Sequence, residues 1–560
     1  MEQLQQDIKT LVEAEFALQL EPKLTIPEQQ FGDVSCNIAL QIAGQLGRSP
    51  KDIAEQLQPH ITALDAVESV SIAGPGFLNV RLTQKKLLEL GDSLPEQVWA
   101  GKTVICEYSD PNPFKVLHAG HLYTTLVGDA VANLFAVAGA HVVRANFGGD
   151  VGLHVAKAMW GIMREIGEQD AEMALLTIDK DQRPNWVSAR YVEGNTAYEE
   201  DESAKAEIVE LNKKVYELHK NKDISELQDN FAKAYWICRK WSYDGFEALY
   251  DRLGVHQFDV YYPESITAEL GIKAAREAQD RGVLVESDGA VVFKGEELGL
   301  HTRVFINSNG LPTYESKDLG LALKKWQDFG FDHSVMITGN DIVEYMKVIK
   351  AVVRTFAPEI SDRTQHITHG MIKLAGGKKM SSRKGNVLLA QEVIDVAEEA
   401  NKTATGKEDM SVVLGAIKWA FLKNRIGGDI IYDPEESVSI VGNSGPYLQY
   451  AHARACSILR KAEGKVVGAL EEVTFDDAER SLLRKLSQYV GAVDQAVTES
   501  APHIICTYLY ELAQSFNSFY EHNRVIDDER EAVRLSLVSR YKNTLAKGLA
   551  ILGIHAPEQM

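Results

Sequence analysis

The stretch TVICEYSDPNPFKVLHAGHLYTTLVGDAVANLFAVAGAHVVRANF, residues 103–147, decides the fold. Its start, residues 103–109, is mainly β-branched and apolar and predicts a strand, and two prolines exclude a helix from the loop that follows. Residues 119–138 have helical periodicity, and residues 141–147 predict a second strand. A strand, a loop, a helix and a strand in this order form a βαβ unit, so we expect a parallel sheet.

The residues before this unit predict a small α/β domain, residues 1–95. We expect three helices in it, at residues 1–20, 35–44 and 49–57, the last with Ser49 as its cap. Two short strands should follow, joined by a turn at Gly74-Pro75-Gly76. Residues 91–102 then predict a linker to the next domain.

The residues after this unit predict two further domains. A doubly wound parallel sheet is expected over residues 100–404, with an insertion of charged helices around residues 155–250. Within it, Asn309 and Gly310 predict the turn of a hairpin. Residues 405–560 have helical periodicity with little strand signal. The expected fold class is therefore α/β, with a small N-terminal α/β domain and an all-helical C-terminal domain.

The composition is typical of a globular protein, with 45% hydrophobic and 25% charged residues among 560. The N-terminus lacks the basic start and apolar core of a signal peptide, and the most apolar stretch, residues 130–143, is too short to span a bilayer. We therefore expect a cytoplasmic protein with no membrane partner. Five scattered cysteines form no C-x-x-C pair and no cluster with histidine, which predicts neither a disulfide framework nor a zinc site.

The net charge of −21 argues against a protein that coats nucleic acid without regard to sequence, and we expect no DNA partner. The acidic excess is unevenly distributed, because it is concentrated in residues 191–230, whereas residues 361–390 carry a net positive charge. A nucleic-acid substrate therefore remains compatible with the composition.

Two histidines mark the junction between the first strand and its helix. His118, Gly120 and His121 fall at the carboxyl end of a parallel strand, where doubly wound sheets bind ligands. The N-terminus of a helix offers free N–H groups to phosphate, and the imidazoles could donate further hydrogen bonds. The chain has no P-loop and no G-x-G-x-x-G pattern. The alternative is a structural histidine pair, for which H-x-G-H alone is no less typical.

A second candidate is the basic stretch GGKKMSSRKGN, residues 376–386. It places four cations, Lys378, Lys379, Arg383 and Lys384, among glycines and serines. Such a loop could close over a triphosphate and stabilise a leaving pyrophosphate. The alternative is a solvated basic loop, which is disfavoured because the stretch follows the α/β half of the chain that carries the histidines.

Together the two stretches resemble the paired signatures of the class I aminoacyl-tRNA synthetases, whose catalytic domain is Rossmann-like. Within that class, Asn112 and Lys115 are similar to the arginyl-tRNA synthetase pattern that precedes the histidines. Four other stretches resemble the same family: FGDVSCNIAL and AGPGFLNVRL at the N-terminal end, YLQYAHARACSILRKA from residue 447, and the closing LGIHAPEQM. The resemblance covers nearly the whole chain and weakens across residues 155–230.

This resemblance implies a substrate pocket and a catalytic set. Asp318 and Glu264 would hold the guanidinium of arginine, Tyr314 would lie against it, and Asn112 would hold the amino-acid end. Tyr314 and Asp318 are spaced to share a helix face, and an ordinary exposed face is the alternative. The catalytic residues would be Lys115, His118, His121, Lys379, Arg383 and Lys384. ATP would contact His118, Gly120, His121, Lys379, Met380 and Ser381.

The chain departs from the wider class pattern at one position of the basic stretch. Ser382 stands where the class has a second lysine. A missing cation should weaken stabilisation of the transition state. In arginyl enzymes the lysine before the histidines is thought to supply the charge instead, and here that residue is Lys115.

The resemblance also implies two contacts with transfer RNA. Phe77 would stack on a base of the D-loop and Asn79 would hydrogen-bond its edge. The alternative for Phe77 is a core aromatic beside a turn. Tyr447, Tyr450 and Arg454 are candidates for contact with the anticodon, with Met560 nearby, although tyrosines at this spacing are equally typical of a helix core.

The sequence therefore predicts an arginyl-tRNA synthetase with arginine, ATP and tRNA(Arg) as partners, Mg²⁺ bound together with ATP, and no zinc. The family is commonly monomeric. Three alternatives remain: another class I synthetase such as the cysteinyl type, a small nucleotidylyltransferase with H-x-G-H, and a non-catalytic relative that binds RNA. The long helical C-terminal region and the Tyr314, Asp318 and Glu264 set favour the first prediction over these.

Overall fold

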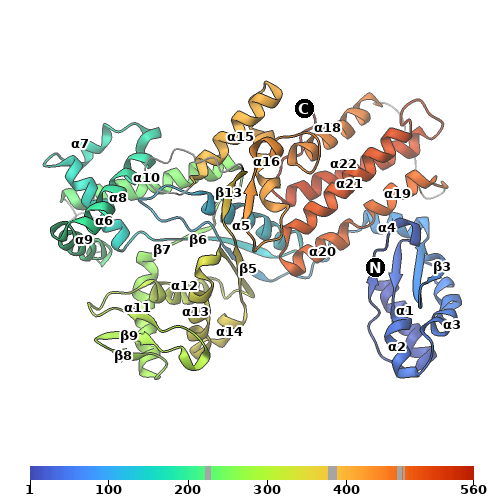
Figure 1. Ribbon diagram of the computed structural model, residues 1–560, viewed down its shortest axis with the longest axis horizontal. Helices are drawn as coiled ribbons and strands as arrows, with labels where there is room; N and C mark the ends of the chain where they lie inside the picture. The colour runs from blue at the N-terminus through green and yellow to red at the C-terminus, as the bar shows by residue number, and fades with distance from the viewer. Residues whose placement is uncertain (221–228, 376–387, 463–469, 471–472) are drawn as a thin grey trace.

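The structure is a computed structural model that describes residues 1–220, 229–375, 388–462, 470 and 473–560. It has three parts: a small N-terminal α/β unit, a central part built on a parallel sheet, and a group of C-terminal helices (Figure 1). The N-terminal unit lies below the C-terminal helices in Figure 1, on the side away from the insertion helices. The predicted fold class is thus confirmed.

The central sheet has five parallel strands in the order β12-β11-β5-β6-β7. Their bounds are β5 Thr103–Glu107, β6 His141–Gly148, β7 Val260–Pro263, β11 His333–Gly339 and β12 Thr364–His369. The first strand in sequence, β5, is central, since the chain adds β6 and β7 on one side and then returns to add β11 and β12 on the other. The point where this order reverses lies between β5 and β11, and ligands bind at the carboxyl ends of strands flanking such a point.

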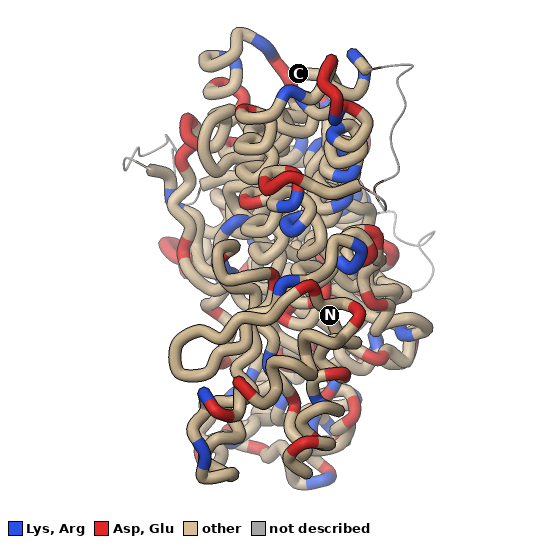
Figure 2. Tube along the Cα trace, turned by 90° about the vertical axis from the view of Figure 1, so that its right-hand side faces the viewer, with Lys and Arg blue, Asp and Glu red and all other residues tan. Residues whose placement is uncertain are grey.

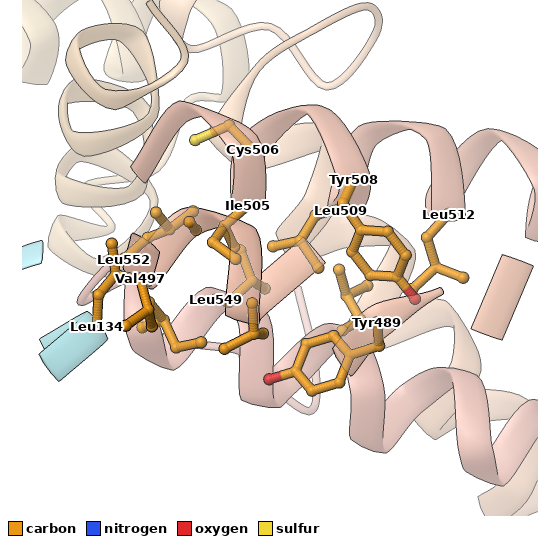
Figure 3. Close-up of a cluster of buried hydrophobic side chains, with 14 of the residues drawn as sticks. Leu134, Tyr489, Val497, Ile505, Cys506, Tyr508, Leu509, Leu512, Leu549 and Leu552 are labelled. Carbon is orange, nitrogen blue, oxygen red and sulfur yellow. The ribbon is translucent and has the colours of Figure 1, made fainter. Parts of the chain in front are cut away.

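Helix α5, Ala119–Val137, follows β5 and is buried along nearly its whole length. One side packs on strands β5, β6 and β11, and the other packs on the C-terminal helices. Leu134 near its end meets the apolar side chains of the C-terminal helices, among them Val497 and Leu552 (Figure 3). The predicted βαβ unit therefore joins the sheet to the helical part through a single continuous core.

The C-terminal part consists mainly of helices, as the sequence predicts. Their bounds are α15 Ala390–Thr405, α16 Met410–Leu422, α17 Pro434–Ser437, α18 Gly445–Lys461, α19 Asp477–Leu486, α20 Tyr489–Glu499, α21 Pro502–His522 and α22 Glu531–Ile551. Among the residues described here, one strand interrupts them: β14, Ile430–Tyr432, pairs in parallel with β13, Ile372–Leu374. This pairing attaches residues 430–432 to the central part of the molecule.

The N-terminal unit is an antiparallel sheet, β1-β2-β4-β3, with helices α1 Glu2–Phe16, α2 Ile38–Leu46 and α3 Pro50–Thr62. Its strands are β1 Leu24–Thr25, β2 Val34–Cys36, β3 Val67–Ala73 and β4 Phe77–Leu82. The helix expected from residue 35 begins only at Ile38, because residues 34–36 pair with β4. The turn predicted at residues 74–76 joins β3 to β4, and both of its glycines have positive φ.

Two arginines fasten this unit to the C-terminal helices. Arg480 and Arg484 on α19 lie 2.7 Å and 3.2 Å from the buried Asp33 carboxylate. The same carboxylate accepts a hydrogen bond from the backbone of Leu82 at 2.8 Å. Helix α4, Gln84–Asp92, also packs on α19 and leads into the segment predicted to be a linker.

The insertion consists of helices α6 Leu153–Ile166, α7 Ala171–Leu176, α8 Arg183–Glu200, α9 Glu202–Lys220 and α10 Asn230–Leu253. The chain then forms α11 Glu264–Asp280 and an antiparallel sheet of β8 Val285–Ser287, β9 Ala290–Phe293 and β10 Arg303–Ile306. The hairpin predicted at Asn309 and Gly310 is reduced to one bridge between Ile306 and Pro312, because helix α12, Tyr314–Phe329, begins directly afterwards. Helices α13 Val343–Phe356 and α14 Pro358–Asp362 complete the central part.

Helices α11 and α12 cross in direct backbone contact. A Cβ atom on Gly271 of α11 would lie 1.8 Å from the carbonyl oxygen of Ser316, and one on Gly320 of α12 would lie 2.1 Å from that of Thr267. Only glycine fits at these two positions. The crossing fixes the first turns of both helices relative to each other.

No helix among the described residues is both long and apolar enough to cross a membrane.

We predict that Gly271→Ala lowers the free energy of unfolding by about 2–3 kcal/mol, since the added methyl group forces two backbones apart. Thermal unfolding followed by circular dichroism measures the change. Gly491→Ala on α20 is the control, because its Cβ atom would meet nothing within 4 Å and alanine favours helix. Equal stability of the two variants would contradict the proposed tight crossing.

Candidate active site

The two predicted histidines form a reciprocal cap at the start of helix α5. The backbone N–H of His118 donates to Nδ1 of His121 at 3.2 Å, and the N–H of His121 donates to Nδ1 of His118 at 3.4 Å. The two rings are stacked with their centroids 3.8 Å apart. Both imidazoles therefore have a fixed position at the carboxyl edge of the sheet.

This arrangement assigns the protons of the two rings. An Nδ1 atom that accepts a hydrogen bond carries no proton, so the proton of each neutral ring is on Nε2. Burial lowers the pKa of both His118 and His121, and the positive charge of Lys115 lowers the pKa of each further. The site thus holds two neutral imidazoles, each with an Nε2–H group available as a donor.

Gly120 between them is required by the same geometry. A Cβ atom at this position would lie 2.9 Å from both Cε1 and Nδ1 of His118. Any larger residue would push the His118 ring out of the cap.

The segment after the basic stretch returns to the histidines. His118 forms an antiparallel bridge with Leu389, the N–H of Ala119 donates to the carbonyl of Leu388 at 2.7 Å, and the N–H of Ala390 donates to the carbonyl of Leu117 at 3.0 Å. The candidates in the basic stretch lie outside the described residues: Lys378, Lys379, Met380, Ser381, Ser382, Arg383 and Lys384. The described chain resumes immediately beside the first histidine.

Asn112 lies beside the loop that follows β6. Its Oδ1 accepts the backbone N–H of Gly149 at 3.0 Å. A Cβ atom on Gly149 would lie 2.4 Å from that oxygen and 3.2 Å from the carboxyl carbon of Glu264. Asn112 and Glu264 therefore line the same small space beside Gly149.

His154 is a neighbour that sequence reasoning missed. Its Nε2 donates to the carbonyl of Gly149 at 2.6 Å. Burial lowers the pKa of His154 to about 3, so the ring is neutral and holds the Gly149 loop in place. Its only sequence signal is its position five residues after a glycine pair that ends a strand.

Glu264 begins helix α11 and pairs with Lys317 of α12 across 2.5 Å. The carboxylate is 4% exposed and the lysine 3% exposed. Burial raises the pKa of Glu264, while the Lys317 ammonium opposes that rise. Sequence reasoning missed Lys317, although it stands between the predicted Tyr314 and Asp318.

The ammonium of Lys317 also faces aromatic rings. Its Nζ lies 5.1 Å from the ring centroid of Tyr314 and 5.7 Å from that of Tyr216 on α9. Tyr314 is 59% exposed, so it marks the side of the pocket that opens to solvent. Glu264 and Tyr314 thus meet around a cation that the chain itself supplies.

Asp318 faces a different partner. Its carboxylate accepts a hydrogen bond from the Tyr345 hydroxyl of α13. Burial raises the pKa of Asp318 to about 7, although the Tyr345 hydroxyl lowers it and the charges of Glu107 and Glu264 add to the rise. Near neutral pH this carboxyl group is therefore protonated in part of the molecules and ionised in the rest.

Lys115 lies at the mouth of the site. Its ammonium is 4.5 Å from the ring centroid of Tyr191 on α8. Its positive charge lowers the pKa of His118, His121 and His154, in addition to the lowering that burial causes. No ion pair of Lys115 is observed among the described residues.

Phe77 and Asn79, the two residues of the N-terminal unit predicted to contact transfer RNA, differ in solvent exposure. Phe77, the first residue of β4, is 39% exposed beside the Gly74 turn. Asn79 lies on the same face of β4 but is only 6% exposed, between Ser35 and Ser71 of the neighbouring strands. The structure therefore presents the ring at the surface and the amide beneath it.

Tyr447, Tyr450 and Arg454, the residues of α18 predicted to contact the anticodon, belong to one cluster of side chains. The Arg454 guanidinium lies 4.8 Å from the ring centroid of Tyr450 and donates to Oδ1 of Asn517 at 3.2 Å. The amide nitrogen of Asn517 donates to the Tyr447 hydroxyl at 2.7 Å, and the Tyr447 ring packs edge-on against Tyr510. Asn517 and Tyr510, both on α21, were missed because their role depends on helix packing.

The C-terminus returns to the same helix. Arg460 donates to the carbonyl of Glu558 at 3.1 Å, and His452 donates to that of Pro557 at 2.8 Å. Met560 is exposed. Lysines and arginines recur along the C-terminal helices in the upper half of Figure 2.

Among the residues that the structure describes, no group of three or more His, Cys, Asp or Glu side chains could hold a metal ion.

Three family models match successive parts of the chain. They are described as the arginyl tRNA synthetase N terminal domain, over residues 2–82; the catalytic domain of tRNA synthetases class I (R), over residues 83–432; and the DALR anticodon binding domain, over residues 448–560.

Curated relatives and solved structures agree with these matches. An arginine–tRNA ligase of Clostridium botulinum is 31% identical, with 95% of each chain covered, and one of Streptococcus equi is 30% identical, with 99% of this chain and 100% of the relative covered. The solved arginyl-tRNA synthetase of Thermus thermophilus is similar over the full length of both chains, with a TM-score of 0.81 at 24% identity. At that identity the last comparison bears on the fold alone.

We predict that Asp318→Asn is more stable than the parent protein at pH 8, with an advantage that shrinks as the pH falls towards 4. The folded carboxyl, with a pKa of about 7, retains a proton that the unfolded carboxyl has released, so its contribution to stability falls as the pH rises from about 4 to 7. Urea unfolding over a series of pH values measures the difference. Asp328→Asn, at the exposed end of the same helix, is the control, and an advantage that does not vary with pH would refute the prediction.

Proposed function

The chain belongs to the class I arginyl-tRNA synthetases, and we propose that the residues described above carry out this family's ligation of arginine to tRNA. The observation that carries the assignment of the site is the histidine cap, whose two Nε2–H donors stand at the N-terminus of the helix that follows the central strand β5. ATP is a substrate of class I synthetases, and arginine is the amino acid that this family ligates.

In the first step, the carboxylate of arginine attacks the α-phosphate of ATP and pyrophosphate leaves. The first turn of α5 offers backbone N–H groups and a positive dipole to the phosphates. His118 and His121 donate from Nε2 to oxygens that gain charge in the transition state. No covalent bond to the protein is needed, because positioning and charge stabilisation suffice.

Lys115 and the basic stretch supply the cations. The charge of Lys115 lowers the pKa of both histidines of the cap, which supports its role as the replacement for the class lysine at whose position Ser382 stands. Lys379, Arg383 and Lys384 belong to the segment that ends beside Leu388, and the bond from Ala119 to Leu388 supports their action on the same triphosphate.

The arginine pocket is formed by Asn112, Glu264, Tyr314 and Asp318. The carboxylates of Glu264 and Asp318 hold the guanidinium, whose planar fork matches them. Tyr314 lies against the guanidinium, and Asn112 holds the amino-acid end. Support comes from the shared space of Asn112 and Glu264 and from the nearness of Tyr314 to the Glu264 partner Lys317.

Mg²⁺ accompanies ATP in this proposal. The described residues offer no cage of carboxylates for it, so its ligands would be mainly phosphate oxygens and water. The ion would neutralise charge on the phosphates.

Transfer RNA contacts both ends of the chain in this proposal. Residues 1–95 meet the D-loop, where Phe77 stacks on a base and Asn79 lies behind it. The helices from residue 405 onward meet the anticodon through the Tyr447, Tyr450 and Arg454 cluster, with Met560 at its edge. We propose that the protein acts as a monomer in the cytoplasm.

Arginine-dependent ATP–pyrophosphate exchange, with and without tRNA(Arg), tests this function, with lysine and cysteine as controls. Exchange with arginine alone among the three amino acids supports it. No exchange with arginine under either condition, in a folded protein that binds ATP, would refute it. A requirement for tRNA would show in addition that the RNA completes the site.

We predict that Lys115→Ala reduces the rate of this exchange by at least about a hundredfold, because a cation that stabilises the transition state is lost. The melting temperature should stay close to that of the parent protein, since the contact observed for the Lys115 ammonium among the described residues is with the Tyr191 ring. Lys102→Ala, at an exposed lysine over Trp99, is the control. Parent-like exchange in Lys115→Ala would remove this lysine from the mechanism.

We predict that Tyr450→Ala weakens binding of tRNA(Arg) by about tenfold, because a stacked base contributes roughly 1–3 kcal/mol. Tyr450→Phe should bind normally, since the ring and its contact with Arg454 remain. Filter binding measures both variants. Equal loss in the two would assign the effect to the hydroxyl rather than to the ring.

A further inference from the structure

The arginine pocket already contains a cation. Lys317 reaches from α12 to Glu264 on α11, and both groups are almost completely buried. The pair lies beside the space that Asn112 shares with Glu264, and a Cβ atom on Gly152 would come within 3.5 Å of the Lys317 Nζ. Lys317 therefore forms an ion pair with Glu264, one of the two carboxylates proposed to bind the arginine substrate.

The surroundings of this ammonium are those of a guanidinium site. It has a carboxylate in contact and the rings of Tyr314 and Tyr216 nearby, a combination that binds cations through charge and through the ring faces. Burial by itself lowers the pKa of Lys317, but the Glu264 carboxylate and the Tyr216 hydroxyl raise it above the usual value. The lysine is thus charged, and Glu264 is not free to receive a second cation without giving up the first.

We propose that Lys317 is a resident counter-cation that arginine displaces from Glu264, so that substrate binding is an exchange of one cation for another. This inference rests on the proposed pocket and adds a specificity-setting residue to it.

The exchange has a physical basis in the two side chains. The ammonium of Lys317 is a point charge with three donors on a flexible stem, whereas the guanidinium of arginine is a planar fork that can bond two carboxylates at once. Arginine gains Asp318 as well as Glu264, whereas the carboxylate that Lys317 is observed to contact is Glu264. Tyr314, whose ring centroid lies 5.1 Å from the ammonium, is largely exposed, so solvent is close to the pair.

The exchange also has a consequence for affinity. When only a fraction of the molecules is able to bind a ligand, the apparent Kd equals the intrinsic Kd divided by that fraction. While Lys317 pairs with Glu264, the pocket is closed to any cationic amino acid. The pair therefore reduces the affinity for arginine and for its cationic analogues by a common factor.

The test is arginine affinity in Lys317→Met, measured by calorimetry on the full-length protein and as KM in aminoacylation. We expect Kd and KM to fall by about tenfold or more, because the competing pair is gone. We expect kcat to stay within about threefold, since only uniform binding changes. Lys157→Met is the matched control: this lysine is also buried and lies 4.1 Å from a tyrosine ring centroid, but it faces Asn195 and Glu199 outside the pocket.

A second variant, Lys317→Arg, tests the proposal independently if Lys317→Met does not fold. In Lys317→Arg, the resident side chain becomes a fork that holds Glu264 more firmly, so the KM for arginine should rise by about tenfold. In the background of Glu264→Gln, Lys317→Met should no longer tighten arginine binding. Unchanged or weaker binding in folded Lys317→Met, an unchanged KM in Lys317→Arg, or tightening that persists without Glu264 would each overturn the exchange.

The same variants separate this inference from the function on which it rests. Glu264→Gln alone should weaken arginine binding if Glu264 belongs to the pocket. If it binds arginine as the parent does, the pocket assignment fails. If it binds weakly while the Lys317 variants behave like the parent, only the exchange fails.

Discussion

Burial of helix α5 between the parallel sheet and the C-terminal helices is the constraint that organises the molecule. The helix is buried on nearly all sides, so its stability depends on both partners. The start of the helix is the exception. The Nδ1 atoms of His118 and His121 each accept the backbone N–H of the other residue, so Nε2 remains available to a ligand. A single helix thus connects the candidate reactive groups to the core of the helical part.

The pocket beside it is dominated by buried negative charge. Four carboxyl groups influence one another there: Glu107, Asp110, Glu264 and Asp318. In the part of the chain that the structure describes, two buried lysines pair with them, Lys325 with Glu107 and Lys317 with Glu264. Burial raises the pKa of Asp318 and of Asp110, since charge is costly to hold without a partner in a dry interior. An additional cation entering this region would relieve that cost, which is a physical reason for a preference for arginine.

The sequence predicted what depends on local pattern. The apolar strands, the prolines of the loop and the periodicity of α5 were sufficient for the βαβ unit, and the position of the histidines at its junction indicated the site. It did not predict that residues 34–36 form a strand, because their partner β4 lies more than forty residues later. Lys317 could not be recognised either, since a lysine between two polar neighbours usually lies at the surface. Its burial depends on Glu264, 53 residues earlier, and on Tyr216 in the insertion.

The attachment of the N-terminal unit by Asp33 has a consequence for synthesis of the protein. The arginine that covers this carboxylate, Arg480, follows it by 447 residues. At roughly 5–20 residues per second, the ribosome makes Arg480 about 20–90 s after Asp33. Throughout that interval Asp33 can still accept from the backbone of Leu82 within its own unit, at 2.8 Å, so its carboxylate has a partner before the arginine arrives. The N-terminal unit can therefore satisfy this buried carboxylate within itself before the C-terminal helices have been synthesised.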